Sequence, residues 1–263
     1  MKMITVKCLL LSLIAIIYLQ TSTTIALETS QQQIISDALK KVAPNVNVAD
    51  AKIEFIEPNL YKIIADSDVF YVSKDGRYFF YGELLDLNEK NTRNWNITNN
   101  ARKTVRKQEL SKFSKKDMLV FKPKKLHYRI KKPLGIVTIF ADTSCPHSKR
   151  LHKEVEEAVA SGLEARYVFF PRAGVGSDSY KQAISIWCSK NRNKEFAMAN
   201  NDEIIPEKTC KHNPIEEQLK FARKMGINAT PSIVLEDGTV LPGFVTADNL
   251  LRIVKEEHAN SGS

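Results

Sequence analysis

Cysteine chemistry is the most specific chemistry that this sequence of 263 residues indicates. Beyond residue 26 the chain carries three cysteines, Cys145, Cys188 and Cys210. In an oxidising compartment an odd number of cysteines favours one disulfide and one reactive thiol. Two sulfurs without histidines at a metal-binding spacing make a poor zinc site, so neither a metal nor another cofactor is expected.

Cys145 lies between a predicted strand and a predicted helix. Residues 136–140 form an apolar run that predicts a buried strand, and Pro146 suits the first turn of a helix. Cys145 is therefore expected at or beside the helix N-cap, where free N–H groups and the helix dipole stabilise a thiolate. His147, when protonated, would add to this effect. The expected result is a cysteine of low pKa that is also a good leaving group.

The first 26 residues have the pattern of a secretory signal peptide that is cleaved near Ala26. Lys2 and Lys7 precede an apolar run at residues 8–19, which is shorter than the roughly 20 residues of a membrane-spanning helix. We expect export to the periplasm. Cleavage would remove two lysines and no acid, which takes the formal net charge from +9 to +9 − 2 = +7.

Residues 27–92 predict a small α+β domain. A helix is expected at residues 31–42, and short strands are expected at 52–56, 60–65, 69–72 and 78–83. Asp75-Gly76 marks a tight turn between the last two strands. The core of so small a domain is marginal, and pairing with a second copy would stabilise it.

Residues 93–117 predict a loop and then a basic linker helix, with Val105, Leu110 and Phe113 as its apolar positions. Residues 118–263 predict an α/β domain, because strands and helices alternate along them. The expected strands are 118–121, 135–140, 165–170, 232–235 and 239–241, and the expected helices are 149–161, 179–190, 215–225 and 247–258.

Positive charge gathers between Arg102 and Lys132. A nucleic-acid or anionic-membrane surface is one interpretation, and a solvated linker helix is the other. We favour the helix and expect no nucleic-acid partner, because export removes the chain from most nucleic acid and no aromatic stacking pattern accompanies the charge.

A set of motifs runs through the chain beyond residue 26. They are Phe140-Ala141-Asp142-Thr143-Ser144-Cys145, Leu151-His152, Phe170-Pro171-Arg172, Ile186-Trp187-Cys188, Gly226-Ile227-Asn228-Ala229-Thr230-Pro231 and Gly238-Thr239-Val240-Leu241-Pro242-Gly243, together with residues 71–77 and Tyr81-Gly82. In combination they resemble the DsbC/DsbG family of periplasmic disulfide isomerases. The resemblance implies an N-terminal cystatin-like dimerisation domain, a linker helix and a C-terminal thioredoxin-like domain.

The same resemblance implies a V-shaped homodimer that holds misfolded, disulfide-containing exported proteins in a common cleft. It implies a cis bond between Thr230 and Pro231 beside the nucleophile, with the backbone of Thr230 free to pair with a substrate strand. It also implies that Cys188 and Cys210 form a structural disulfide, which would contribute roughly 3 kcal/mol by closing a loop.

One position departs from the family pattern. The family's active site is Cys-x-x-Cys, whereas this sequence has Ser148 in place of the second cysteine, and its Pro146-His147 pair resembles that of the oxidase DsbA. Cys145 therefore has no partner for an internal active-site disulfide, and the family's membrane reductant, DsbD, would find none to reduce. Isomerisation still needs only one attacking thiol, because a thiol of the substrate can release Cys145.

Other interpretations fit the same residues. The chain could be a dimeric holdase chaperone with a vestigial thiol, or Ser148 could replace a natural cysteine so that mixed disulfides are trapped. A monothiol glutaredoxin-like iron–sulfur carrier is a third, although that role needs glutathione and a reducing compartment. His127, His152, His212 and His258 show no partner pattern and are interpreted as structural or surface groups.

Overall fold

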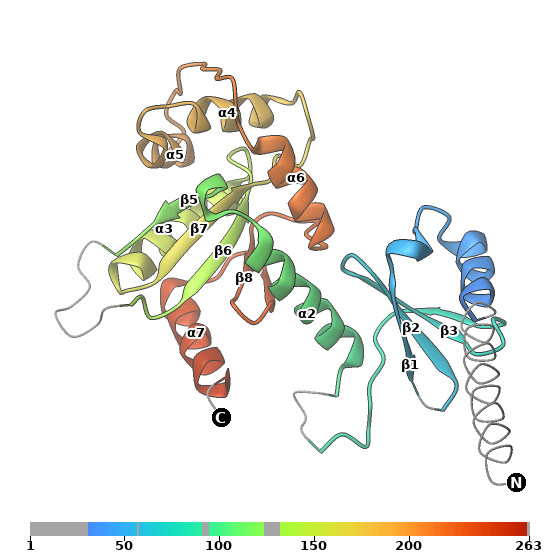
Figure 1. Cartoon of the computed structure of the whole chain (residues 1–263). Coiled ribbons are helices and arrows are strands. Elements are labelled where there is room, and N and C mark those ends of the chain that lie inside the picture. The colour runs from blue at the N-terminus through green and yellow to red at the C-terminus, as the bar shows by residue number, and fades with distance from the viewer. Residues whose placement is uncertain (1–30, 57, 91–94, 124–131, 262–263) are drawn as a thin grey trace, which may run out of the picture. The chain divides into compact units, whose positions relative to one another are not determined.

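A computed structural model describes residues 31–56, 58–90, 95–123 and 132–261 of the chain (Figure 1). The predicted signal segment, residues 1–26, lies outside these ranges. The chain forms two compact units that divide between Leu85 and Asp86. Within the described residues, no helix combines the length and the apolar character that crossing a membrane requires.

The N-terminal unit is one helix and a four-stranded antiparallel sheet that share a core. Residues 31–42 are helical, and the elements that follow are η1 (Val48–Asp50), β1 (Lys52–Ile56), β2 (Leu60–Ala65), β3 (Asp68–Ser73) and β4 (Phe79–Tyr81). The strands lie side by side in chain order. Ile35 and Leu39, four residues apart on the helix, are buried with Ile63 and Val72 of the sheet. The predicted helix and strands are therefore confirmed.

The second unit contains a five-stranded sheet. Its elements are α2 (Ile97–Lys112), η3 (Lys115–Asp117), β5 (Leu119–Phe121), β6 (Ile136–Ala141), α3 (Pro146–Ala160), β7 (Glu164–Phe169), α4 (Asp178–Trp187), α5 (Arg192–Asn200), α6 (Ile215–Lys224), β8 (Ser232–Val234), β9 (Val240–Pro242) and α7 (Ala247–Ser261). The strand order is β5-β7-β6-β8-β9, in which β6 and β7 are parallel and the other neighbours are antiparallel.

Strand β6 lies at the centre of this sheet and is buried on both faces. Val137 and Ile139 belong to one core together with Leu151 of α3, whereas Phe140 belongs to a second core together with Phe221 of α6. Successive side chains of a strand point to opposite faces, so the apolar run of β6 supplies both cores. This double burial fixes the end of β6, from which the chain turns into α3 (Figure 1).

Two helical segments differ most from the sequence prediction, while α3, α4 and α7 differ from it by about three residues at one end. The linker helix, expected to continue to residue 117, ends at Lys112 because Phe113 adopts an extended backbone and stacks on Phe221, with 4.0 Å between the ring centroids. Helix α5 was not expected at all, since its apolar residues lack clear helical spacing. The side chain of Asn191 caps it by accepting a hydrogen bond from the Lys194 N–H, and Phe196 is buried.

Gly238, in the turn between β8 and β9, lies against the backbone of α2. Its φ is +87°, and a Cβ at this position would lie 2.2 Å from the carbonyl oxygen of Lys103. Gly174 has a similar φ of +84°, but a Cβ there would meet no atom within 4 Å. Substitution of Gly174 would therefore cost only the strain of a positive φ, whereas substitution of Gly238 would add a steric overlap with Lys103.

We expect Gly174→Ala to lower the free energy of unfolding by about 1–2 kcal/mol, the cost of a left-handed backbone. Gly238→Ala should lower it further, by at least about 1 kcal/mol, because its methyl group also displaces α2. Urea denaturation measures both losses. Equal losses in the two variants would contradict the close approach of Gly238 and Lys103.

Candidate active site

Cys145 is the N-cap residue of α3, as the sequence predicts, and Pro146 is the first residue of the helix. Residues 142–144 connect it to the end of β6. No side chain caps this helix, so its first backbone N–H groups remain available to the Cys145 sulfur. Cys145 is 2% exposed and is the free cysteine of the described residues.

The loop before Cys145 is held by the carboxylate of Asp142, which is buried. Its Oδ1 accepts hydrogen bonds from the backbone N–H and the hydroxyl of Ser144, at 2.9 and 2.7 Å. Its Oδ2 accepts a hydrogen bond of 2.9 Å from the backbone N–H of Arg172 and lies 3.5 Å from Nε of that residue. Asp142 was not among the predicted site residues, although an Asp three residues before an expected N-cap is a turn-forming signal.

The peptide bond between Thr230 and Pro231 is cis, and it lies against Cys145. The Cys145 thiol donates a hydrogen bond to the backbone carbonyl of Thr230, with 3.3 Å between sulfur and oxygen. The hydroxyl of Thr230 is buried and has no hydrogen-bond partner among the described residues. Two segments that are distant in the sequence therefore meet at the sulfur.

Two opposing effects set the pKa of the Cys145 thiol below its ordinary value. Burial raises this pKa, and hydrogen bonds to the thiolate lower it by more. The donors are the backbone N–H and hydroxyl of Ser148, the hydroxyl of Thr230 and the backbone N–H of His147. The unpaired Thr230 hydroxyl is thus a donor that becomes useful once the thiol ionises.

Ser148 and His147 differ in their surroundings. Ser148 is 2% exposed, and its Oγ accepts a long hydrogen bond of 3.4 Å from the Asp142 N–H. The side chain of His147 is exposed to solvent. The structure thus brings Cys145, Ser148 and Thr230 together, whereas the ring of His147 is exposed and is not part of this buried group.

Cys188 and Cys210 are joined by a disulfide, and their Cα atoms lie 5.5 Å apart. Cys188 caps the C-terminus of α4, so the bond ties this helix to the irregular segment that precedes α6. No cluster of His, Cys, Asp and Glu suited to a metal ion occurs within the described ranges.

Two domain families match this chain. A thioredoxin-like domain family matches residues 124–257, and the N-terminal domain of disulfide bond isomerase proteins matches residues 26–99. The thiol:disulfide interchange protein DsbC of Dickeya dadantii (strain 3937) is 30% identical over 199 residues, which are 75% of this chain and 77% of that protein. The chain belongs to the DsbC family.

Two further comparisons cover different shares of the chain. The DsbC of Pasteurella multocida (strain Pm70) is 29% identical over 223 residues, which are 84% of this chain and 89% of that protein. A crystal structure of a disulfide interchange protein from Neisseria gonorrhoeae shares 24% sequence identity, has a TM-score of 0.46, and is matched over 55% of this chain and 97% of its own.

Membership of the DsbC family confirms the family predicted from the motifs and the predicted fold class. The chain joins a DsbC-type N-terminal domain to a thioredoxin-like domain, and its activity is thiol–disulfide exchange as a disulfide isomerase. This chemistry takes place on sulfur, so the residues that surround Cys145 form the candidate active site of this DsbC-family protein.

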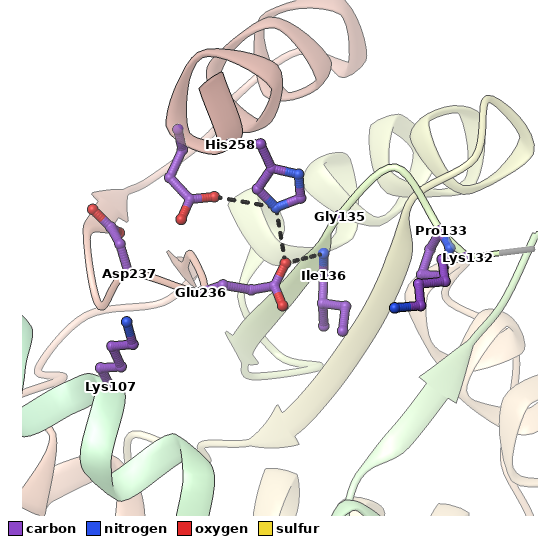
Figure 2. A pocket seen from close by; sticks show the side chains of 9 residues that line it. Lys107, Lys132, Pro133, Gly135, Ile136, Glu236, Asp237 and His258 are labelled. Carbon is purple, nitrogen blue, oxygen red and sulfur yellow. Dashed lines mark hydrogen bonds and ion pairs between the residues drawn. The ribbon is translucent and has the colours of Figure 1, made fainter. Parts of the chain in front are cut away.

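The C-terminal unit also contains a pocket among charged residues, which is separate from the Cys145 site (Figure 2). It has a volume of about 500 Å³ and is lined by Lys107 of α2, Glu236 beside β8, and His258 of α7. His258 Nε2 lies 3.1 Å from Glu236 Oε2, which also accepts a hydrogen bond of 3.1 Å from the Ile136 N–H. These contacts attach the last helix to the start of β6, which agrees with the structural role expected for His258.

The lowered pKa of Cys145 can be tested through alkylation. The rate of reaction with iodoacetamide should rise with pH through a midpoint below the ordinary thiol value of about 8.5, because only the thiolate reacts. Ser148→Ala removes one hydroxyl donor and should move this midpoint to higher pH, whereas Ser161→Ala, at the far end of α3, should leave it unchanged. A midpoint that stays in place in Ser148→Ala would contradict the assigned donor.

Proposed function

We propose that this DsbC-family protein isomerises disulfides through a single nucleophilic cysteine, Cys145. Its substrates would be misfolded, disulfide-containing proteins exported to the periplasm. The observation that carries the proposal is that Cys145 is the free cysteine of the described residues, while Ser148 occupies the position of the second cysteine in Cys-x-x-Cys. The pattern of residues 1–26 and the Cys188–Cys210 disulfide support an exported, oxidising location.

In the first step the Cys145 thiolate attacks one sulfur of a substrate disulfide. A new sulfur–sulfur bond joins enzyme and substrate, the old bond breaks, and the second substrate sulfur leaves as a thiolate that takes a proton from solvent. The N-terminus of α3 and the hydroxyl groups of Ser148 and Thr230 favour the Cys145 thiolate as nucleophile and later as leaving group.

In the second step another thiolate of the same substrate attacks its own sulfur in the mixed disulfide. A different substrate disulfide forms and the Cys145 thiolate leaves, so one disulfide is consumed, one is formed and no electrons are gained or lost. Ser148 cannot carry out this release because its oxygen does not form a disulfide. A substrate without a suitable thiol therefore stays attached until an outside thiol frees it.

We assign Thr230 and Pro231 to substrate binding. In the resting state the Thr230 carbonyl accepts a hydrogen bond from the Cys145 thiol, with 3.3 Å between sulfur and oxygen, and ionisation of Cys145 removes that donor. The carbonyl is then free to accept an N–H from an extended substrate strand, which places the substrate beside the sulfur. Pro231 has no N–H of its own and so cannot compete for such pairing.

His147 is assigned to the active site through its backbone N–H, one of the donors that lower the Cys145 pKa. Its ring is exposed, so solvent screens the charge that it would carry when protonated. Cys188 and Cys210 are assigned a structural role, since their disulfide ties α4 to the segment before α6. A membrane reductant of the DsbD type has no internal active-site disulfide to act on, and substrate or solution thiols would release Cys145 instead.

A homodimer through the N-terminal unit is the proposed assembly. Apolar side chains on this unit are open to solvent, among them Phe55, Tyr78, Phe80 and Tyr81, which are 46–62% exposed. Strands β1 and β4 are both sheet edges, and edges of this kind are protected when another chain covers them. The match to the N-terminal domain of disulfide bond isomerase proteins supports the same assembly.

The exchange mechanism is tested by two activities of the full chain. The protein should rearrange scrambled disulfides in a substrate that retains free thiols, yet should fail to reduce insulin unless a small thiol is added, because Ser148 cannot expel the product. The reduced Ser148→Cys chain should reduce about one insulin disulfide per molecule, because its own two thiols supply the electrons and end as an internal disulfide, and Cys145→Ala should lose both activities. If Cys145→Ala rearranges scrambled substrate as well as the parent chain, the mechanism is wrong and a holdase function takes its place.

The assembly is tested by light scattering. A chain that begins at Asn88 lacks the N-terminal unit but keeps both cores of the second unit, so it should be a folded monomer, whereas the full chain should be a dimer. Phe80→Asp in the full chain should also weaken the dimer, because it places a charge on the proposed contact surface. A shortened chain that remains dimeric would contradict this assignment.

A further inference from the structure

A pocket of about 440 Å³ lies along the active-site helix α3, away from Cys145. Its apolar wall comes from Phe121 of β5 and from Val155 and Val159 of α3. His152, which also lines it, is seven residues beyond Cys145, so it lies roughly 10 Å further along the helix axis. The pocket is therefore distinct from the thiol site.

His152 carries an unsatisfied polar atom at this pocket. The residue is 3% exposed, and its Nδ1 lies 2.9 Å from the hydroxyl oxygen of Tyr167. Its Nε2 is buried and has no hydrogen-bond partner among the described residues. A buried polar atom without a partner costs free energy, so the site gains stability from any molecule that supplies one.

Burial lowers the pKa of His152 to about 4, so the ring is neutral at pH 7. Tyr167 keeps its proton, because burial raises the pKa of its hydroxyl well above the ordinary value. When the Tyr167 hydroxyl donates to Nδ1, the neutral ring carries its own proton on Nε2. Nε2 is then a hydrogen-bond donor, and it lies near Glu156, which also lines the pocket.

The nearest charged group to this nitrogen is the carboxylate of Glu156, one helical turn further on. Its Oε1 lies 3.8 Å from His152 Nε2, which is too long for a hydrogen bond. The Glu156 side chain is 57% exposed and is not bonded to the nitrogen, so it can move aside when a ligand enters. An inserted hydroxyl group could accept from Nε2–H and donate to the Glu156 carboxylate, because a hydroxyl is both acceptor and donor.

The remaining surroundings select a neutral ligand with a ring. Lys122 and Glu156 at the pocket carry opposite charges, so neither sign of ligand charge is favoured. Phe121 and Val159 are partly exposed and offer apolar surface to a flat body, and a rigid ring loses little conformational entropy on binding. These features together specify a small aromatic molecule with one hydroxyl group.

We propose that this pocket is a binding site for a small neutral phenol, whose hydroxyl oxygen bridges His152 Nε2 and the Glu156 carboxylate. The site is separate from the exchange reaction, and Cys145 plays no part in it. Binding should therefore persist in Cys145→Ala, so failure of this proposal and failure of the exchange mechanism give different results.

The test compares para-cresol with toluene, which differ only by the hydroxyl group. In an NMR titration of the full chain with ¹⁵N-labelled histidine, para-cresol should bind about three- to ten-fold more tightly than toluene, the usual contribution of one hydrogen bond. It should also shift the Nε2 resonance of His152, which toluene should not do. Equal affinity of the two probes, or binding of neither, would overturn the proposal.

Three variants locate the site. His152→Phe keeps a ring but removes the nitrogen, so the advantage of para-cresol over toluene should fall to what the exposed Glu156 carboxylate alone contributes. Ala160→Trp fills the pocket from its exposed rim and leaves His152 intact, so both probes should lose binding. Glu157→Gln, an exposed neighbour on α3, is the control and should bind as the parent chain does. Unchanged para-cresol binding in Ala160→Trp would place the ligand elsewhere and refute the site.

Discussion

The hydrogen bonds of one buried carboxylate, that of Asp142, set the geometry on which the active site depends. A carboxylate away from water is stable only when its oxygens are paired. Here each oxygen has its own partner, Ser144 on one side and Arg172 on the other. The loop between β6 and α3 is thereby tied to the loop after β7, and Cys145 is held at the first turn of the helix with little freedom to move.

The pairing of strands in the sheet brings Thr230 and Pro231 close to Cys145. Strand β6 lies between β7 and β8, and Phe140 pairs with Ser232 in the antiparallel register of β6 and β8. This register places the residues just before Ser232, including the cis bond of Pro231, beside the chain that leaves β6. The contact of Cys145 with Thr230 therefore follows from the strand order and the register of the sheet.

Patterns within the sequence were sufficient for much of this architecture. The apolar run of β6 and the proline after Cys145 gave the strand and the N-cap correctly, because both depend on local chemistry. Helix α5 and the early end of α2 were missed, since each is decided by a distant contact: Phe196 is buried in the main core, and Phe113 stacks on Phe221.

The candidate site likewise contains some features that local sequence predicts and others that depend on distant residues. The backbone donors at Cys145 could be expected from a helix start, whereas the part played by Asp142 depends on Arg172, thirty residues further on. His152 had no recognisable partner in the sequence because its neighbours, Tyr167 and Phe196, come from a strand and a helix elsewhere in the chain. Interactions between distant segments are the ones that a single sequence conceals.

Because residue 148 is a serine, the oxidation state of Cys145 is not set by the reduction potential of an active-site cysteine pair. A pair of active-site cysteines has a reduction potential of its own, and its oxidation state follows the potential of the compartment. Cys145 with Ser148 beside it has no such internal couple. The fraction of Cys145 held in mixed disulfides would instead follow the concentrations of the disulfides that it attacks and of the thiols that release it. The same protein would therefore respond to the load of misfolded chains as well as to the small thiols of its compartment.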